Sequence, residues 1–345
     1  MSSAGVRVAV VGATGLVGQT MLAVLRERDF PASEIVPFAS ERSAGSELDG
    51  MTVQGLSADS IQGFDIALFS AGAGVSREWG PRFVEAGAVV VDNSSAFRRD
   101  PSIPLVVSEV NPHALQGHRG LIANPNCSTM QLLVALAPIH RAVGIERLVV
   151  STYQSVGGTG KQAIDELDTQ AHTSLHGMEM PAPEIYPSHI AFNVIGAAGS
   201  FAEGDDHTDE ERKMMFETRK ILEDESIGVA VTCVRVPVRI GHSIAVNIQT
   251  REALSAEAAR ALLSEAPGVA VQDGPVPAVQ DVPSPLTAQG RDEVFVGRIR
   301  RDESHPRGLN MWIVADNLRK GAATNAVQIA ELVVGARQRG PAAVS

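Results

Sequence analysis

Residues 6–18 read VRVAVVGATGLVG, and this stretch decides the fold. Its apolar start is typical of a buried parallel strand. The strand runs directly into a turn with three glycines and then into a helical pattern. Gly12 allows the tight turn, Gly15 lets the backbone approach a pyrophosphate, and Gly18 lets helix and strand pack closely. Because a helix N-terminus also attracts anions, the stretch predicts a dinucleotide-binding domain. A glycine turn without a nucleotide is the alternative.

Further apolar strands are expected at residues 35–39, 65–70 and 89–92, each followed by a polar or glycine-rich loop. Strands that alternate with helical segments indicate a mostly parallel sheet. We therefore predict an α/β protein. A Rossmann-type domain should span 1–125 and be completed by a C-terminal helix at 318–340. An α+β catalytic and dimerisation domain with a mixed, largely antiparallel sheet should span 126–317.

The overall composition restricts the class of protein. The chain has 345 residues, a natural length for two domains. Its net charge of −11 argues against nucleic-acid binding, since no basic surplus exists to neutralise phosphates. Two cysteines cannot form a disulfide framework. Residues 1–5 lack the features of a signal peptide, and no apolar run is long enough to span a membrane. A cytoplasmic location without a membrane partner is expected.

Residues 124–129 read NPNCST and contain the candidate nucleophile. They follow a short apolar run and precede an apolar helical segment, with Asn126 as a good N-cap. Cys127 then lies in the first helical turn, where unpaired N–H groups and the helix dipole favour a thiolate. A buried structural cysteine is the alternative, but the polar neighbours favour the nucleophile.

The loop after the second strand reads SERSAG at 40–45 and bears on the choice of cofactor. A domain that selects NAD often carries an acidic residue here for the ribose 2′-hydroxyl, whereas an arginine accommodates the 2′-phosphate of NADP. Arg42, flanked by two serines, favours NADP. We interpret Glu41 as solvated, and an ordinary polar loop is the alternative.

A strand is predicted over residues 228–238, and both of its faces are largely apolar. We expect both faces to be covered, by helices or by another subunit. An arginine in such a strand is costly unless it meets an anion. A substrate carboxylate is a reasonable partner for Arg235, and a protein carboxylate elsewhere is the alternative. Cys233 is interpreted as core. His242 lies at the end of the next turn, where strand geometry makes it a candidate base.

Charged side chains elsewhere are candidates for anion binding. Thr208 and Glu211 have the spacing of a capping box, and on the helix that follows Glu210 and Lys213 share a face. An exposed ion pair is the alternative for these two. Arg98 lies in a polar loop after a strand and could hold an anionic group, with a solvated loop as the equal alternative. Residues 190–195 are expected to form a strand.

A cysteine together with a nicotinamide domain suggests aldehyde oxidation through a thiohemiacetal and a thioester. A short-chain dehydrogenase is an alternative for the glycine turn, and it needs a Tyr-x-x-x-Lys pair. The only tyrosines, Tyr153 and Tyr186, are followed four residues later by Gly157 and Ile190. That alternative therefore lacks its catalytic pair.

These motifs together resemble the aspartate-β-semialdehyde dehydrogenase family over almost the full chain. The motifs are GATGLVG at 12–18, DNSSAFR at 92–98, NPNCST at 124–129, SVGGTG at 155–160, RVPVRIGHS at 235–243 and DNLRKGAA at 316–323. The resemblance implies reduction of L-aspartyl-4-phosphate by NADPH to aspartate 4-semialdehyde with release of inorganic phosphate. It places this reaction in the biosynthesis of lysine, threonine, methionine, isoleucine and diaminopimelate.

The resemblance also implies a role for each site residue. Cys127 would be the nucleophile that carries the acyl group, His242 the general acid/base, and Gln154 the group that orients the acyl intermediate. Arg235 would pair with the substrate carboxylate, Glu210 would support the substrate site, and Arg98 and Lys213 would hold phosphate. The positions implied in NADP binding are Gly12, Thr14, Gly15, Leu16, Val17, Ser40, Arg42, Ser43, Gly157, Gly158 and Asn317. No metal is implied, and the assembly would be a homodimer or a dimer of dimers.

Two further alternatives stay open. N-acetyl-γ-glutamyl-phosphate reductase performs the same chemistry on a longer substrate with a related fold, although its cysteine and histidine stand in different contexts. A catalytically silent homologue could instead serve as a subunit or a binding module. The presence of every catalytic residue type argues against the silent homologue.

Overall fold

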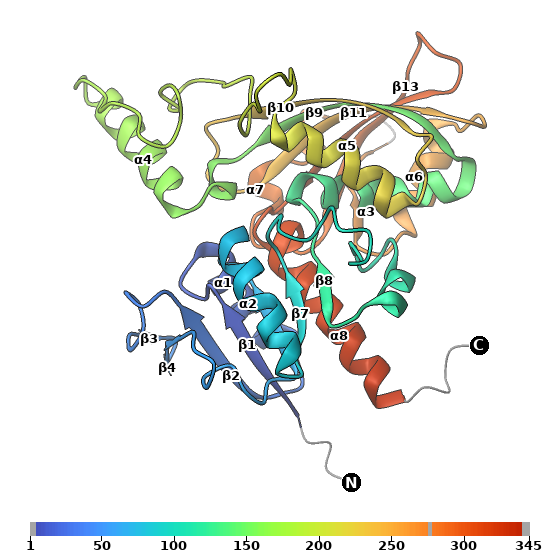
Figure 1. Ribbon diagram of the computed structural model, residues 1–345. Helices are drawn as coiled ribbons and strands as arrows, with labels where there is room; N and C mark the ends of the chain where they lie inside the picture. The colour runs from blue at the N-terminus through green and yellow to red at the C-terminus, as the bar shows by residue number, and fades with distance from the viewer. Residues whose placement is uncertain (1–4, 275–277, 340–345) are drawn as a thin grey trace. The chain divides into compact units, whose positions relative to one another are not determined.

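The computed structural model describes residues 5–274 and 278–339 (Figure 1). The chain divides into two compact units. The first contains the described residues up to Asn126 and those from Ala322 onward, and the second contains Cys127–Gly321. Most of the N-terminal stretch examined for a signal peptide, and residue 340 of the expected C-terminal helix, lie outside the described residues.

The first unit is built on a parallel sheet, which confirms the prediction from alternating strands and helices. The strand order is β5-β2-β1-β6-β7-β8, and every pair is parallel. The strands of the first unit are β1 Val6–Val11, β2 Ala32–Ala39, β5 Gln54–Gly55, β6 Ile66–Phe69, β7 Val89–Asp92 and β8 Leu121–Ala123, with a separate hairpin of β3 Glu47–Leu48 and β4 Met51–Thr52.

Both faces of this sheet are buried, so its strands are apolar throughout. Val8 and Val10 pack on the side of the helices α1 and α8, while Ala9 and Val11 pack on the side of α2 with Phe83. The helices of the first unit are α1 Leu16–Glu27, α2 Ala73–Glu85 and α8 Thr324–Arg339, with a 3₁₀ segment at Pro112–Gly117. The late helix α8 thus belongs to the first unit, although it comes from the end of the chain.

The second unit has a mixed sheet in the order β10-β9-β11-β14-β13-β12. The pairs β10–β9 and β12–β13 are parallel, and the three central pairs are antiparallel. This confirms the largely antiparallel sheet that we predicted. Its strands are β9 Ile145–Gln154, β10 Gly228–Arg235, β11 His242–Thr250, β12 Val269–Val271, β13 Val294–Arg301 and β14 Gly308–Ala315.

Helices cover one face of this mixed sheet (Figure 1). Helix α3 packs on its central strands, α5 packs on β10, and α6 packs on β12 and β13. The opposite face exposes Val149, Tyr153, Ala230 and Thr232. The helices of the second unit are α3 Cys127–Val143, α4 Lys161–Leu175, α5 Asp209–Leu222, α6 Ala256–Ser264 and α7 Pro285–Ala288, with 3₁₀ turns at Val156–Gly158 and Val279–Asp281. A π-helical turn, Arg319–Ala323, leads from this unit into the first.

Two predicted strands differ from the structure. Residues 190–195 do not form a strand: Asn193 closes a turn on Ile190, Phe192 has a positive φ, and only Ile195 pairs with a neighbouring strand. Strand β10 ends at Arg235 rather than at residue 238. Pro237 follows two residues later, and it has no backbone N–H to extend the ladder.

Among the described residues, none of the helices combines the length and the apolar character needed to cross a membrane.

Candidate active site

Cys127 is the first residue of α3 and is partly buried. Its Sγ lies 3.2 Å from Nε2 of His242, the first residue of β11. A β-carbon on Gly321 would lie only 2.9 Å from Cβ of Cys127, so a glycine is needed where the chain passes the thiol. The structure therefore brings the predicted nucleophile and the predicted base into direct contact.

The backbone of Ser155 determines which nitrogen of His242 carries the proton. The Ser155 N–H donates to Nδ1 of the imidazole at 3.0 Å. A backbone amide can only donate, so Nδ1 must hold a lone pair, and the neutral ring carries its hydrogen on Nε2. Nε2 faces Cys127, and the sulfur is therefore the acceptor in this contact. In this tautomer neutral His242 can donate to the sulfur or to an oxyanion, but it cannot accept the thiol proton at Nε2.

The surroundings keep His242 neutral. Its side chain has no exposed surface. Burial, and secondarily the charge of Arg235, lower the pKa of His242 from 6.5 to about 3. The Ser155 amide acts in the same direction, because a protonated Nδ1 would point at another donor. His242 is consequently an uncharged hydrogen-bond donor throughout the neutral pH range.

The lowered pKa of His242 predicts how stability depends on pH. The unfolded chain binds a proton at this residue below about pH 6.5, whereas the folded chain does so only near pH 3. Stability is therefore lost as the pH falls through this window. Since one pKa unit corresponds to about 1.4 kcal/mol, wild type should lose about 2 kcal/mol more than a His242→Gln variant between pH 7 and pH 5. Denaturant unfolding at both pH values measures this difference, and equal losses would contradict a buried neutral imidazole.

Strands β9 and β10 end side by side and place two further predicted residues at the site. Their parallel register pairs Gln154 with Arg235. Gln154 is buried, and its Nε2 lies 3.3 Å from Oγ1 of Thr152. Just beyond Gln154, a β-carbon on Gly158 would lie 3.3 Å from the His242 ring and 3.7 Å from Nη1 of Arg235. A side chain at position 158 would therefore press on both the imidazole and the guanidinium.

Arg235 is a buried cation held in place by neutral groups. It is 8% exposed, its Nη1 donates to the carbonyl of Ser155 at 2.8 Å, and its guanidinium lies 5.8 Å from the ring of Tyr186. Its Nε is buried and has no hydrogen-bond partner among the described residues. No carboxylate in the described part of the chain forms an ion pair with it. Because a buried charge is costly without a counterion, this arrangement favours an anionic ligand over the alternative of a protein acid.

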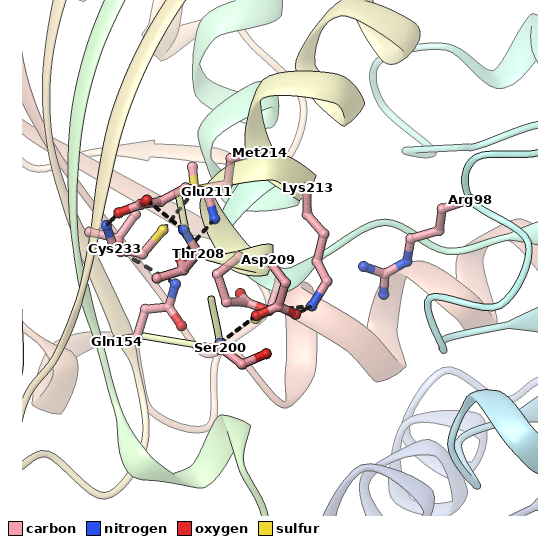
Figure 2. Close-up of polar contacts among 12 residues, drawn as sticks. Arg98, Gln154, Ser200, Thr208, Asp209, Glu211, Lys213, Met214 and Cys233 are labelled. Carbon is pink, nitrogen blue, oxygen red and sulfur yellow. Dashed lines mark hydrogen bonds and ion pairs between the residues drawn. The ribbon is translucent and has the colours of Figure 1, made fainter. Parts of the chain in front are cut away.

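Helix α5 carries the other predicted substrate residues of this unit. The predicted capping box of Thr208 and Glu211 is present and starts the helix. Nζ of Lys213 lies 2.6 Å from Asp209 and 2.7 Å from Glu210, and Figure 2 shows the lysine extending along the helix beside Asp209. The side chains of Lys213 and Glu210 are 23% and 15% exposed, so this is not the exposed pair of the alternative reading. Burial lowers the pKa of Lys213, but the two carboxylates outweigh it and hold the pKa above its usual value.

Asn317 is connected to His242 through the side chain of Ser155, whose Oγ lies 3.2 Å from Nδ1 of the imidazole. Its Oδ1 accepts from Oγ of Ser155 at 3.0 Å and from the backbone N–H of Gly241 at 2.8 Å. Its Nδ2 is buried and has no hydrogen-bond partner within the residues described. An unused buried donor of this kind is suited to a polar ligand atom, as expected of a cofactor-binding residue.

In the first unit the glycine turn has the shape of a phosphate cradle. Gly12 has φ +87°, and any β-carbon there would collide with the carbonyl of Ser70. A β-carbon on Gly18 would collide with the carbonyl of Gly12. Gly15 is the N-cap of α1 and supplies no capping side chain. The first-turn N–H groups of α1, next to the exposed Thr14, are therefore suited to an anion.

Two arginines of the first unit differ in setting. Arg42 is exposed in a turn that Ser43 closes by donating to Ser40 at 2.8 Å. Arg42 itself forms no hydrogen bond or ion pair with the described residues. Arg98 is only 7% exposed, and its Nη2 donates to the carbonyl of Asn93 at 2.9 Å. Arg98 is therefore not part of a solvated loop.

Three residues with a part in the site were not identified from the sequence. Ser155 orients His242 through a backbone amide, which any residue except proline supplies. Tyr186 packs on Arg235 and donates to Oγ1 of Thr159 at 2.9 Å. Gly321 makes room for Cys127. Ser155 and Gly321 belong to the motifs at 155–160 and 316–323, but neither motif by itself indicates these contacts, and Tyr186 lies in no recognised motif.

Comparison with known proteins follows the division into two units. A family model described as the NAD binding domain of semialdehyde dehydrogenase matches residues 7–118. A second, described as the dimerisation domain of semialdehyde dehydrogenase, matches residues 136–320. The aspartate-semialdehyde dehydrogenase of Aquifex aeolicus is 54% identical over 96% of this chain and 98% of its own. That of Legionella pneumophila is 53% identical over 94% and 95%.

Solved structures agree with these matches. Aspartate semialdehyde dehydrogenase II of Vibrio cholerae, solved in complex with ASA, has a TM-score of 0.91 and 49% identity, covering 96% of this chain and 99% of that one. The Candida albicans aspartate semialdehyde dehydrogenase, solved with NADP, has a TM-score of 0.71 and 26% identity, covering 96% and 98%. The similarity therefore extends over both units.

Proposed function

The chain belongs to the aspartate-semialdehyde dehydrogenase family, and from this premise we propose that it reduces L-aspartyl-4-phosphate to L-aspartate 4-semialdehyde and phosphate with NADPH. The contact of 3.2 Å between Cys127 and the buried donor His242 is the observation that carries this proposal. It supplies a nucleophile for an acyl carbon and, beside it, a hydrogen-bond donor for the oxygen that becomes negative.

The first step would be attack of the Cys127 sulfur on the acyl carbon of the substrate. A C–S bond forms, the C–O bond to the phosphoryl group breaks, and phosphate leaves with the thiol proton. The product is a thioester on Cys127. The helix N-terminus at Cys127 and the Nε2–H of His242 both favour negative charge on the sulfur.

The second step would convert this thioester to the aldehyde. Addition of hydride gives an alkoxide, which collapses as the C–S bond breaks and the thiolate is released. The Nε2–H of His242 would stabilise the alkoxide oxygen. We propose that Gln154, buried at the end of β9, orients the acyl group by its amide.

The substrate would be held by charge at both ends. A bidentate bond from Arg235 would anchor the substrate carboxylate, in agreement with its burial without a counterion. Glu210 would support the substrate site, and Lys213 and Arg98 would bind phosphate. Because the site combines anionic substrate groups with neutral His242, the cations rather than the imidazole would balance the charge.

The glycine cradle and the unused amide of Asn317 support the binding of a dinucleotide. The pyrophosphate would be held by Gly12, Thr14, Gly15, Leu16 and Val17. The ribose 2′-phosphate would be bound by Ser40, Arg42 and Ser43. In the second unit the cofactor would be contacted by Gly157, Gly158 and Asn317. A bound NADPH would supply the hydride for reduction of the thioester. The NADP in the Candida albicans structure agrees with this choice of cofactor.

The choice between NADP and NAD can be tested at Arg42. Arg42→Glu replaces an exposed cation with an anion that repels a 2′-phosphate and can accept from a 2′-hydroxyl. Binding of NADP should weaken on the order of a hundredfold, while binding of NAD should change little. Titration of both cofactors by fluorescence measures this, with Glu41→Arg as the matched control in the same turn. An equal loss of affinity for both cofactors would show that Arg42 does not bind the 2′-phosphate.

The reaction itself is best tested in the oxidative direction. Aspartate semialdehyde, NADP and inorganic phosphate should give NADPH, followed by its absorbance, and omission of phosphate should stop turnover. Turnover with N-acetylglutamate semialdehyde instead would identify the related reductase. Cofactor binding without turnover of either aldehyde would support a non-catalytic subunit.

We also propose that the protein forms a homodimer through its mixed sheet. The face opposite α3 and α5 exposes apolar side chains that include Val149 and Tyr153, and the matched family model of this unit is a dimerisation domain. A second copy on this face would cover the outer side of β10. Both faces of this strand are largely apolar in sequence, and we expected both to be covered. A dimer of dimers, a cytoplasmic location and a place in the biosynthesis of lysine, threonine, methionine and isoleucine belong to the same proposal.

A further inference from the structure

Strand β10 lies at the edge of the mixed sheet, and its outer hydrogen bonds are made in an unusual way. At Arg235 both backbone groups bond to Ile195, at 2.8 and 3.0 Å. At Cys233 the carbonyl accepts from the N–H of Ala198 at 2.8 Å. The N–H of Cys233 instead donates to a side chain, Oε1 of Glu211 at 3.0 Å. A carboxylate thus takes the place of a strand in this ladder.

The same carboxylate closes the N-terminus of α5. Oε2 of Glu211 accepts from the N–H of Thr208 at 2.9 Å, and Oγ1 of Thr208 accepts from the N–H of Glu211 at 3.3 Å. Glu211 is 8% exposed and Thr208 is 1% exposed. Figure 2 shows Glu211 reaching from the helix to Cys233, with Thr208 beside it. Each oxygen of one buried carboxylate therefore binds a different element.

This double contact joins the two elements that carry the substrate-binding charges. Glu210 precedes Glu211 in the chain, and Lys213 follows it on the same helical turn. Arg235 lies two residues beyond Cys233 on β10. The side chain of Cys233 also packs on Met214 of α5, with sulfur atoms 3.7 Å apart. A shift of α5 along β10 would change the distance between the proposed carboxylate anchor and the proposed phosphate site.

Capping alone does not require this geometry. A capping box is complete once its glutamate binds the N-cap amide, and the second oxygen is then free to face solvent. Here that oxygen is buried against a strand instead. Only a side chain with two acceptor oxygens and the length of glutamate satisfies both amides at once.

We propose that Glu211 is a positioning residue, which fixes Glu210 and Lys213 on α5 in register with Arg235 on β10. This inference rests on the proposed function, because it assigns the two elements to opposite ends of one substrate. Glu211 touches neither substrate nor cofactor in this scheme. It acts through the separation of residues that do.

We call this double contact of Glu211, with the N–H groups of Thr208 and Cys233, the clamp. Glu211→Gln tests the clamp with little change in the shape of the side chain. The amide keeps one acceptor oxygen but turns a donor NH₂ toward the N–H of either Thr208 or Cys233, so one of the two bonds is lost. KM for aspartate semialdehyde and KM for phosphate should each rise about tenfold, because uniform binding is weakened. KM for NADP should stay within about twofold of wild type.

Two control variants separate the clamp from ordinary helix capping. Thr208→Ala removes the capping hydroxyl but leaves the bond from Cys233 to Glu211 intact. Ser255→Ala removes the N-cap of α6, where Oγ of Ser255 accepts from the N–H of Ala258 at 3.1 Å, and this helix packs on β12, β13 and α3. Both should leave the two KM values near those of wild type. The clamp is refuted if folded Glu211→Gln keeps wild-type KM values, or if Thr208→Ala raises them equally.

Amide hydrogen exchange of the wild-type protein gives a second measurement that needs no turnover. The N–H groups of Cys233, Thr208 and Glu211 should exchange with similar protection factors, because opening the clamp exposes them together. Fast exchange at Cys233 beside a protected helix start would overturn the inference even if Glu211→Gln fails to fold. A wild-type protein inactive on aspartate semialdehyde would instead overturn the proposed function and leave the exchange result standing.

Discussion

Replacing Cys127 with alanine is expected to lower kcat by on the order of 10⁴-fold or more, to the limit of detection. The reason is that the reaction loses its covalent intermediate, and among the residues that the structure describes the sulfur of Cys127 is the only hydrogen-bond contact of His242 Nε2. NADP should still bind, since Cys127 is not one of the residues proposed to hold the cofactor and the glycine turn belongs to the other unit. Turnover and cofactor titration on the same preparation measure both quantities.

The chain offers a matched control in its second cysteine. Cys233 is fully buried, as predicted, and burial raises the pKa of its thiol to about 12, so it stays protonated and unreactive. Cys233→Ala should cost about 1 kcal/mol of stability from the small cavity and leave kcat within about twofold of wild type. If iodoacetamide abolished activity while labelling Cys233 rather than Cys127, the assignment of the nucleophile would be wrong.

His242→Ala should lower kcat by about 10²- to 10⁴-fold. The variant loses the donor at 3.2 Å from the sulfur and opens a cavity beside Arg235. His242→Gln is the informative comparison, because a glutamine amide can donate a hydrogen bond but cannot exchange a proton. If neutral His242 acts by donation, as its tautomer indicates, glutamine should recover about tenfold of the loss.

The tautomer itself can be observed directly. Nitrogen NMR of the labelled protein distinguishes a protonated from an unprotonated ring nitrogen, and Nδ1 of His242 should be the unprotonated one at pH 7. If Nδ1 carries the proton, His242 could accept the thiol proton at Nε2 and would act as a general base. Glutamine at position 242 should then be as inactive as alanine.

Much of the fold was predictable because it depends on local patterns. The turn after the first strand needs glycine at two positions, because Gly12 has a positive φ and Gly18 has no room for a side chain. Both glycines are visible in the sequence motif. Successive side chains of each parallel strand point to opposite faces of the sheet, and both faces are buried. The strands therefore appear in the sequence as continuous apolar runs. The capping box at Thr208 was also readable, since its two partners are three residues apart.

The remaining features depend on contacts between distant segments. Ser155 lies 87 residues from His242, and it acts through an amide that carries no sequence signature. Glu211 was recognised as a capping residue, but its bond to Cys233, 22 residues away, could not be read from the spacing. The error at residues 190–195 has the same origin. Apolar residues there suggested a strand, whereas the segment turns at Phe192 and contributes only Ile195 to the edge of β10.

The contacts that close the carboxyl end of the β10 edge also affect how the protein behaves at high concentration. An edge strand with free N–H and C=O groups can pair with the same edge of another molecule and seed aggregates. Here Ile195, Ala198 and Glu211 occupy the outward groups of Cys233 and Arg235, and the buried charge of Glu211 would oppose an incoming strand. These contacts therefore also hinder edge-to-edge pairing at the carboxyl end of this strand, while the exposed face of the sheet stays available for a closed dimer.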